Sequence, residues 1–269
     1  MTEQEETAPT VETVKNEFEQ FALDPAIIKA LNKMGFIKPS AVQQHTIPLI
    51  QAGKDLIALS QTGSGKTAAC AIPICNQALI EKKQIQTLII VPTRELALQY
   101  ATEVQKIGRY KGVQTLAIFG GKDADIQQSK LKHGVQVLVA TPGRLMDFIY
   151  SQQIDLSNVT TLILDEADEM LSMGFKKDLD TILSALPATK NRWLFSATLP
   201  EGIRQIINSH LSSNAIKIKV SGKNVVNKKI EHKYILVEDA DKLTTLLQYL
   251  KFKGKERGIV FCKTKNTTK

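Results

Sequence analysis

The 269-residue sequence contains little cysteine and tryptophan and no long apolar run. Three cysteines, Cys70, Cys75 and Cys262, are too few and too odd in number for a disulfide framework, which fits a reducing compartment. No stretch approaches the roughly 18 consecutive apolar residues that a membrane span needs. The acidic N-terminus also lacks the pattern of a secretion signal. We therefore expect a cytoplasmic protein with no membrane partner.

Composition and charge indicate a folded protein with an uneven charge distribution. With 43% hydrophobic and 23% charged residues, disorder is excluded, and the length predicts one large domain or two smaller ones. Residues 1–20 hold six acids against one lysine, whereas residues 215–269 hold fourteen lysines or arginines against five acids. The net charge of +8 favours a polyanionic partner such as nucleic acid. A solvated lysine-rich surface explains the composition equally well.

Short apolar runs alternate with segments of helical spacing. The runs occupy residues 55–60, 87–91, 115–119, 135–140, 161–165, 192–197 and 216–220. Most are continuous rather than alternating, as in strands that are covered on both faces. Residues 94–108 show the 3.6-residue spacing of an amphipathic helix. The pattern predicts an α/β fold with a parallel sheet and helices on both faces, whose ligands bind outside the carboxyl ends of the strands.

The polar segment 221–232 is interpreted as a linker between two domains. Beyond it, we expect strands at 233–237 and 258–262 and a helix at 241–252, as in the opening of a second α/β domain. The predicted organisation is a disordered acidic tail (1–17), a first domain (18–220), the linker (221–232) and the start of the second domain (233–269). Since those last strands have few neighbours to pair with, we expect residues 221–269 to be mobile or irregularly packed.

The segment SQTGSGKT, at residues 60–67, has the pattern of a phosphate-binding loop between a strand and a helix. Its candidate nucleotide-binding residues are Ser60, Gln61, Thr62, Gly63, Ser64, Gly65, Lys66 and Thr67. Lys66 can reach the β- and γ-phosphates, and the Thr67 hydroxyl can bind Mg²⁺. Ser60 replaces the usual first glycine of this pattern. The alternative is a glycine-rich turn that binds no nucleotide.

The segment LILDEAD, at residues 162–168, places acids directly after a buried strand. Asp165 suits a contact with Mg²⁺, either direct or through water, and Glu166 can position or deprotonate an attacking water. Two acids at this place can also be the cap and first turn of a helix. The phosphate loop about a hundred residues earlier favours the functional interpretation.

Together, SQTGSGKT and DEAD resemble the DEAD-box family of ATP-dependent RNA helicases. Further segments resemble the family's other motifs in the same order: GFIKPSAVQ (35–43) the Q motif, PTRELALQ (92–99) motif Ia, Gly120–Gly121 the paired glycines, TPGR (141–144) motif Ib, SAT (196–198) motif III and GIVFCKTK (258–265) motif IV. The resemblance covers residues 18–265 and places the Q motif within residues 18–44. It implies RecA-like domains, ATP and Mg²⁺ as cofactors, and RNA-dependent ATP hydrolysis with local unwinding of RNA duplexes.

The resemblance also implies roles at the nucleotide. Gln43 would read the edge of adenine and Phe36 would stack on the base, although Phe36 could equally be a core residue. Phe18 and Lys38 complete the Q-motif candidates. Ser196 and Thr198 would hydrogen-bond the carboxylates of the DEAD segment and join Lys66, Asp165 and Glu166 as the catalytic set.

For RNA, the residues that match the family's motifs are Pro92, Thr93, Arg94, Gly121, Thr141 and Arg144. Hydroxyl and arginine side chains near helix starts contact phosphates, so the implied binding is independent of base sequence. The two arginines could instead be partners in intramolecular ion pairs. We expect a monomer.

Members of this family need two RecA-like domains, and only about forty residues follow the predicted linker. We expect the chain to be the N-terminal part of a longer helicase, with at most a trace of ATPase activity alone because it lacks the arginines of the second domain. One alternative is a non-catalytic module that binds ATP and RNA. Another is a phosphate-loop ATPase that acts on DNA or protein, which the Q, Ia and Ib segments disfavour.

Overall fold

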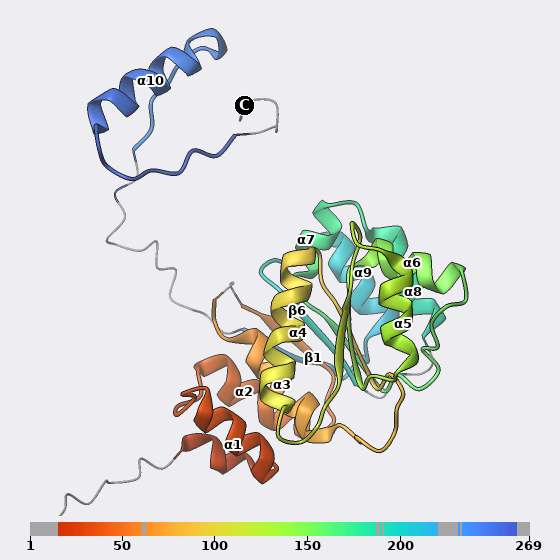
Figure 1. Cartoon of the computed structure of the whole chain (residues 1–269). Coiled ribbons are helices and arrows are strands. Elements are labelled where there is room, and N and C mark those ends of the chain that lie inside the picture. Colours follow the sequence, from red (N-terminus) through yellow and green to blue (C-terminus); the bar gives the residue numbers. More distant parts are fainter. Residues whose placement is uncertain are drawn as a thin grey trace, which may run out of the picture. The chain divides into compact units, whose positions relative to one another are not determined.

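In a computed structural model of the chain, residues 16–60, 63–186, 189, 191–219, 231 and 233–262 are described. The chain divides into two units, Met1–Asn224 and Val225–Lys269 (Figure 1). Each unit is considered by itself. None of the helices in the described parts is long and apolar enough to cross a membrane.

The first unit is built on a sheet of seven strands, all paired in parallel. The strands are β1 (Leu56–Leu59), β2 (Thr87–Ile90), β3 (Thr115–Ile118), β4 (Val137–Ala140), β5 (Thr161–Leu164), β6 (Asn191–Ser196) and β7 (Ile216–Lys219). Their spatial order is β3-β4-β2-β5-β6-β1-β7. Each strand lies within or overlaps one of the seven apolar runs, so the predicted parallel sheet is confirmed.

Helices cover both faces of this sheet (Figure 1). They are η1 (Glu17–Phe21), α1 (Pro25–Lys33), α2 (Ala41–Gln51), α3 (Lys66–Gln77), α4 (Arg94–Gly108), α5 (Ala124–Lys132), α6 (Pro142–Tyr150), α7 (Ala167–Ser172), α8 (Lys176–Ala185) and α9 (Glu201–His210). Helices α1–α4 pack with η1 on one face, and α6–α9 pack on the other.

Each face has its own hydrophobic core because successive strand residues point to opposite sides. In β1, Leu56 and Ala58 join the core beneath α1–α4, whereas Ile57 joins the core beneath α6–α9. Trp193 of β6 is 1% exposed and belongs to the first core. A strand that is buried on both faces needs apolar residues at every position, which explains the continuous runs.

Local sequence signals set the starts of the helices that matter for the site. Helix α4 begins after Thr93, whose hydroxyl accepts a hydrogen bond from the amide of Leu96 at 3.2 Å. Helix α2 begins after Ser40, whose amide donates to the Gln43 side chain in a capping box. Helix α4 has the same bounds as the predicted amphipathic helix at 94–108.

The folded part of the first unit begins two residues earlier than predicted. Asn16 is 3% exposed, caps η1 by accepting from the Phe18 amide, and donates to the carbonyl of Phe36 at 2.7 Å. Asn16 and Glu17 therefore belong to the folded unit, although the sequence placed them in the acidic tail. The rest of that tail, residues 1–15, lies outside the described residues.

In the second unit, the described residues form η2 (Asp239–Asp241) and α10 (Lys242–Lys253). The helix expected at 241–252 is confirmed, but the strands expected at 233–237 and 258–262 are wrong, since those residues have no strand structure. A strand needs a neighbour to pair with, and the described part of this unit supplies none. Apolar side chains such as Leu236 (88% exposed) and Phe261 (92% exposed) are left open to solvent. Most of the predicted linker and residues 263–269 lie outside the described residues.

Candidate functional site

The sheet order separates the motifs into two groups at the carboxyl ends of the strands. The phosphate loop follows β1, the DEAD segment follows β5 and the SAT segment ends β6, and these three strands are neighbours. The segments proposed for RNA follow β2, β3 and β4, which are also neighbours. The topology therefore brings each set of motifs together along its own half of one sheet edge, as expected for an open α/β sheet.

The phosphate loop approaches α2 closely at Gly65, the residue before α3. Gly65 has a φ of +92°, and a Cβ atom there would lie 2.9 Å from Gln43 Nε2 and 3.0 Å from Ser40 Oγ. Gly63 also has a left-handed φ of +78°, but a Cβ there would meet nothing within 4 Å. Both conformations are costly for residues with a side chain. Gln61 and Thr62 lie outside the described residues.

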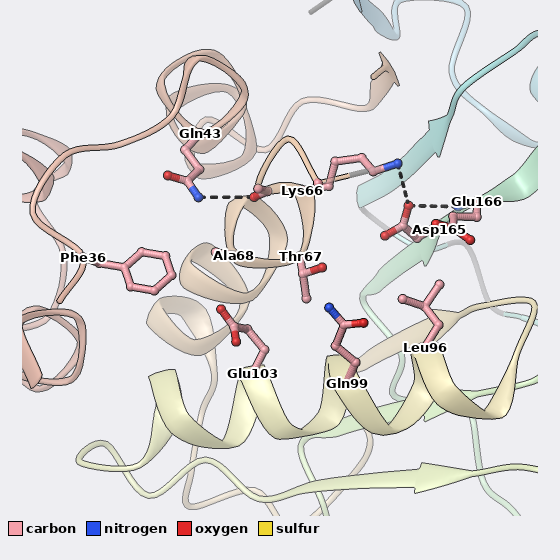
Figure 2. Close-up of a pocket in the computed structure, with 12 residues that line it drawn as sticks. Phe36, Gln43, Lys66, Thr67, Ala68, Leu96, Gln99, Glu103, Asp165 and Glu166 are labelled. Atoms are coloured by element: carbon pink, nitrogen blue, oxygen red, sulfur yellow. Dashed lines mark hydrogen bonds and ion pairs between the residues drawn. The ribbon is translucent and has the colours of Figure 1, made fainter. Parts of the chain in front are cut away.

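Lys66, the first residue of α3, is held inside the protein by two groups. Its Nζ donates to the Ser60 carbonyl at 3.2 Å and lies 3.7 Å from Asp165 Oδ1 (Figure 2). Lys66 is 6% exposed and Asp165 2% exposed. Burial raises the pKa of Asp165 to about 6, although Lys66 and the Glu166 amide, which donates to Oδ1 at 2.9 Å, both favour the ionised form.

Glu166 has a left-handed backbone with a φ of +52°, which is rare for a residue other than glycine. It is the residue before α7, and its side chain lines the same pocket as Asp165. Strain of this kind costs about 1–3 kcal/mol and is concentrated at functional sites. The strained turn places Glu166 in the lining of the pocket next to Asp165.

The DEAD and SAT segments are joined by hydrogen bonds through Asp168. The carboxylate of Asp168 accepts from the Thr198 hydroxyl at 2.7 Å and from the Thr198 amide at 2.9 Å. The Ser196 hydroxyl accepts from the Asp168 amide at 3.3 Å and donates to the Thr198 carbonyl at 2.7 Å. Burial raises the pKa of Asp168, but its hydrogen bonds with Thr198, Ser196 and Ala197 together lower it more, so that the net pKa lies below its usual value. Asp168 was not among the predicted site residues.

The side-chain amide of Gln43 is oriented by two backbone groups. Its Oε1 accepts from the Ser40 amide at 2.8 Å, and its Nε2 donates to the Gly65 carbonyl at 3.2 Å. Because the first partner can only donate and the second can only accept, the positions of oxygen and nitrogen are fixed. One lone pair on Oε1 and one hydrogen on Nε2 stay available to a ligand.

The other Q-motif candidates occupy three different environments. Phe36 is half-buried and lines the pocket beside Gln43. Phe18 is 0% exposed and packs with ring centroids 6.2 Å from Phe36, so no ligand can reach it and its contact supports the Phe36 ring instead. Lys38 is exposed, lies 3.9 Å from a carboxylate oxygen of Glu17, and does not line the pocket.

The phosphate loop, the Q-motif residues Phe36 and Gln43, and the acids Asp165 and Glu166 surround a cavity of about 390 Å³ (Figure 2). Its lining residues are Phe36, Gln43, Gly63, Gly65, Lys66, Thr67, Ala68, Leu96, Gln99, Glu103, Asp165 and Glu166. Leu96, Gln99 and Glu103 of α4 also line the pocket, although the sequence motifs did not indicate them as nucleotide-binding residues. Their spacing of three and four residues could have shown that they share one helix face, but not that this face borders the phosphate loop.

The chemistry of the pocket fits a nucleotide phosphate with Mg²⁺. The loop supplies left-handed glycines at the start of a helix, and the Ser64 Oγ is buried without a hydrogen-bond partner among the described residues. Thr67 and Asp165 offer hydroxyl and carboxylate oxygens, the ligand type that Mg²⁺ prefers. The described residues contain no cluster of three or more His, Cys, Asp or Glu side chains that could bind a metal alone. Mg²⁺ would therefore need phosphate oxygens or water to complete its ligands.

The second group of motifs meets around Phe119, which follows β3. The guanidinium carbon of Arg94 lies 5.1 Å from the Phe119 ring centroid, and Lys122 Nζ lies 5.6 Å from it. Gly121 has a φ of +80°, and a Cβ there would lie 3.8 Å from Nη1 of Arg94. These contacts bring the segments after β2 and β3 together at the surface.

Arg144, in the first turn of α6, connects the segment after β4 to the same region. Its Nη2 donates to the carbonyl of Lys122 at 3.1 Å, and its Nε lies 3.5 Å from an oxygen of Asp147. Its ion pair with Asp147 is the alternative that the sequence left open, but Nη1 is buried without a partner in the described structure. Thr141 precedes α6, and Pro92 and Thr93 precede α4, so both helix N-termini lie at this edge of the sheet.

A model of the DEAD/DEAH box helicase family matches residues 40–206. The chain belongs to this family. The chain is 42% identical to the ATP-dependent RNA helicase CshA of Listeria monocytogenes over 248 residues, which cover 92% of the chain and 48% of that protein. It is 41% identical to the ATP-dependent RNA helicase DeaD of Buchnera aphidicola over 252 residues, or 93% of the chain and 42% of that protein. The predicted resemblance to DEAD-box helicases is confirmed, and the chain spans about half the length of these relatives.

Solved structures of the family share the fold. A DEAD box protein from the hyperthermophile Methanococcus jannaschii superimposes with a TM-score of 0.73 at 38% identity, over 93% of this chain and 67% of that one. A hypothetical ATP-dependent RNA helicase from Sulfolobus tokodaii gives a TM-score of 0.68 at 39% identity, over 73% of this chain and 57% of that one. The sheet described above is therefore a RecA-like domain of a DEAD-box helicase.

Proposed function

We propose that the chain binds ATP with Mg²⁺ and single-stranded RNA, and that it represents the N-terminal part of a cytoplasmic ATP-dependent RNA helicase. In this proposal residues 16–220, with the Q motif at 18–44, form the first RecA-like domain. Residues 221–232 are the linker, and residues 233–269 begin the second domain. The observation that most strongly supports ATP binding is the buried contact of Lys66 with Asp165 in a pocket that also contains Phe36 and Gln43.

The oriented amide of Gln43 supports adenine as the base. Adenine presents the N6 amino group as a donor beside the N7 acceptor, whereas guanine presents two acceptors, O6 and N7. The free lone pair and the free hydrogen of the Gln43 amide complement the first pattern and not the second. Phe36, at the same end of the pocket, offers an aromatic face for stacking.

Each group around the phosphates has a separate task. The loop amides and Lys66 would bind the β- and γ-phosphates, and Thr67 and Asp165 would hold Mg²⁺, with Asp165 in direct contact or through water. When bound, Mg²⁺ neutralises charge on the phosphate oxygens. Glu166 would position the attacking water and accept its proton. Asp168, with Ser196 and Thr198, would transmit changes at the nucleotide to the segment after β6.

RNA would bind along the other half of the sheet edge. Its proposed contacts are Pro92, Thr93, Arg94, Gly121, Thr141 and Arg144. The N-termini of α4 and α6 and the guanidinium groups near Phe119 supply donors for phosphate oxygens. Because these groups face a backbone rather than base edges, binding should be independent of sequence.

ATP hydrolysis tests the coupled activity. Turnover is measured with and without single-stranded RNA, on this chain and on the chain extended by the second RecA-like domain of a relative. We expect RNA to stimulate the extended protein, Glu166→Gln to abolish the stimulation, and the chain alone to show at most a trace. If the extended protein binds ATP and RNA but RNA leaves its turnover unchanged, the coupled function is wrong and a non-catalytic binding module is the better description.

A further inference from the structure

Helix α4 lines the nucleotide pocket on the side opposite Gln43. Leu96, Gln99 and Glu103 line the cavity from successive turns of this helix. Figure 2 shows Leu96 beside the Asp165–Glu166 end, Gln99 beneath Thr67 and Glu103 beside Phe36. The helix therefore runs along the length of a nucleotide whose phosphates lie at Lys66 and whose base lies at Phe36.

Glu103 is an unusual side chain for a pocket that binds phosphates. Among the residues that the structure describes, no hydrogen bond or ion pair within the 4 Å limit for such pairs involves its carboxylate. Partial burial raises the pKa of Glu103, and the nearby Lys106 lowers it by less. The carboxylate oxygens of Glu103 are not among the buried side-chain atoms without a partner, so water can reach them in the free protein. A ligand that displaces this water would need to bring a donor in its place.

The chemistry of an adenine nucleotide narrows the possible partners of this carboxylate. The anionic phosphates would be repelled by the Glu103 carboxylate, and the loop and Lys66 are already proposed to bind them. The hydrogen-bonding edge of the base is complemented by Gln43 on the opposite side. Two kinds of uncharged donor remain, namely the second N6 hydrogen of adenine, at the base end of the pocket, and the sugar hydroxyls, which lie between base and phosphates. The sugar is the better match because Glu103 lies between Phe36 and Thr67 (Figure 2).

We infer that Glu103 accepts a hydrogen bond from the ribose hydroxyls of the bound nucleotide and thereby selects ribonucleotides over deoxyribonucleotides. An acidic side chain performs the same task on the ribose in dinucleotide-binding folds, at a different place in the sheet. The inference depends on the proposed binding of ATP in this pocket.

Isothermal titration calorimetry with unlabelled nucleotides tests the inference, because a fluorescent group on the ribose would block the hydroxyls in question. ADP, 2′-deoxy-ADP and 3′-deoxy-ADP, each with Mg²⁺, are titrated into the full chain and its variants. We expect ADP to bind about tenfold more tightly than at least one deoxy analogue, as for a hydrogen bond to a charged acceptor. Glu103→Ala should remove this difference, and Glu103→Gln, which keeps an acceptor, should retain part of it.

Two control variants separate this role from a general effect on the pocket. Glu95→Ala removes an exposed acid from the first turn of the same helix, outside the pocket, and should keep the ribose preference. Gln43→Ala should lose the preference for ADP over GDP but keep that for ribose. Equal affinities of the unaltered chain for ADP and both deoxy analogues would overturn this inference but would leave the proposed ATP site standing. An equal loss of affinity for all three nucleotides in Glu103→Ala would also overturn it. A chain that binds none of the nucleotides would overturn the proposed ATP site as well.

Discussion

The Nε2 atom of Gln43 donates to the carbonyl oxygen of Gly65 at 3.2 Å, so the Q-motif helix α2 is bonded directly to the phosphate loop. The Ser40 hydroxyl makes a parallel contact, donating to the Ser64 carbonyl at 3.0 Å. The residues proposed to bind the base and those proposed to bind the phosphates are therefore linked by hydrogen bonds. A substitution in α2 should alter phosphate binding, and a substitution in the loop should alter base recognition.

Gln43→Ala should reduce the preference for ADP over GDP. The unaltered chain is expected to prefer ADP by roughly ten- to a hundredfold, since mismatched hydrogen bonds at a buried edge cost about 1–3 kcal/mol. Competition between the two nucleotides, measured by calorimetry, gives the ratio. Equal affinities of the unaltered chain for ADP and GDP would contradict the assigned role.

Gly65→Ala should destabilise the domain more than Gly63→Ala. Both changes place alanine in a left-handed conformation, which costs about 1–2 kcal/mol. Only at Gly65 would the new Cβ also displace Gln43 and Ser40, at 2.9 and 3.0 Å. Urea denaturation gives the two free energies of unfolding. Equal free energies of unfolding would show that Gln43 and Ser40 do not pack closely against Gly65 in solution.

Thr198→Val should cost about 1 kcal/mol by removing the hydroxyl donor to Asp168. Thr181→Val is the matched control, since its hydroxyl donates only within an exposed helix turn. In a double-mutant cycle with Asp168→Asn, the two changes should be strongly non-additive. Additive costs would mean that this hydrogen bond contributes nothing to stability.

The same contact should depend on pH in a defined direction. Burial raises the pKa of Asp168, but its hydrogen bonds with Thr198, Ser196 and Ala197 together outweigh this effect and leave the pKa below its usual value of 3.8. A carboxyl whose pKa is lowered by folding stabilises the protein above its unfolded-state pKa and loses that contribution as the pH falls through the lowered value. The cost of Thr198→Val should thus be complete at pH 7 and shrink below about pH 4. A cost that grows in acid would contradict this sign.

Arg94→Ala and Arg144→Ala should each weaken RNA binding for all sequences alike. Each lost phosphate contact should reduce the salt dependence of log K by about 0.7. Arg109→Ala is the control, because Arg109 lies at the opposite end of α4, away from the carboxyl edge of the sheet. Fluorescence anisotropy with two single-stranded RNAs of unrelated sequence gives the affinities at several salt concentrations. A loss confined to one sequence would indicate contacts with bases instead of phosphates.

The sequence predicted the sheet well because a parallel sheet that is buried on both faces needs continuous apolar runs, such as that of β4, where every residue is buried. The sequence predicted strands poorly where their formation depends on pairing with a strand that is distant in the sequence. The apolar residues at 233–237 have the composition of a strand, yet the described part of their unit offers no neighbouring strand.

The motif residues of the candidate site could be found from local spacing, but its walls could not. The resemblance to the Q motif placed Phe18 among the nucleotide-binding candidates, and only the three-dimensional packing shows that its ring is buried against Phe36. Glu103 lies on the predicted helix at 94–108, and only the packing of α4 against α3 turns its side chain into the pocket.

The most direct test of the account is calorimetric titration of ADP with Mg²⁺ into the unaltered chain and into Lys66→Met, which keeps the length and apolar stem of the side chain but removes its charge. The buried position of Lys66, 3.7 Å from Asp165, makes it the group on which phosphate binding should depend most. We predict saturable binding to the unaltered chain and an affinity at least about tenfold lower in a folded Lys66→Met variant, as for the loss of a hydrogen bond to a charged group. Equal affinities, or no binding to the unaltered chain, would contradict the account.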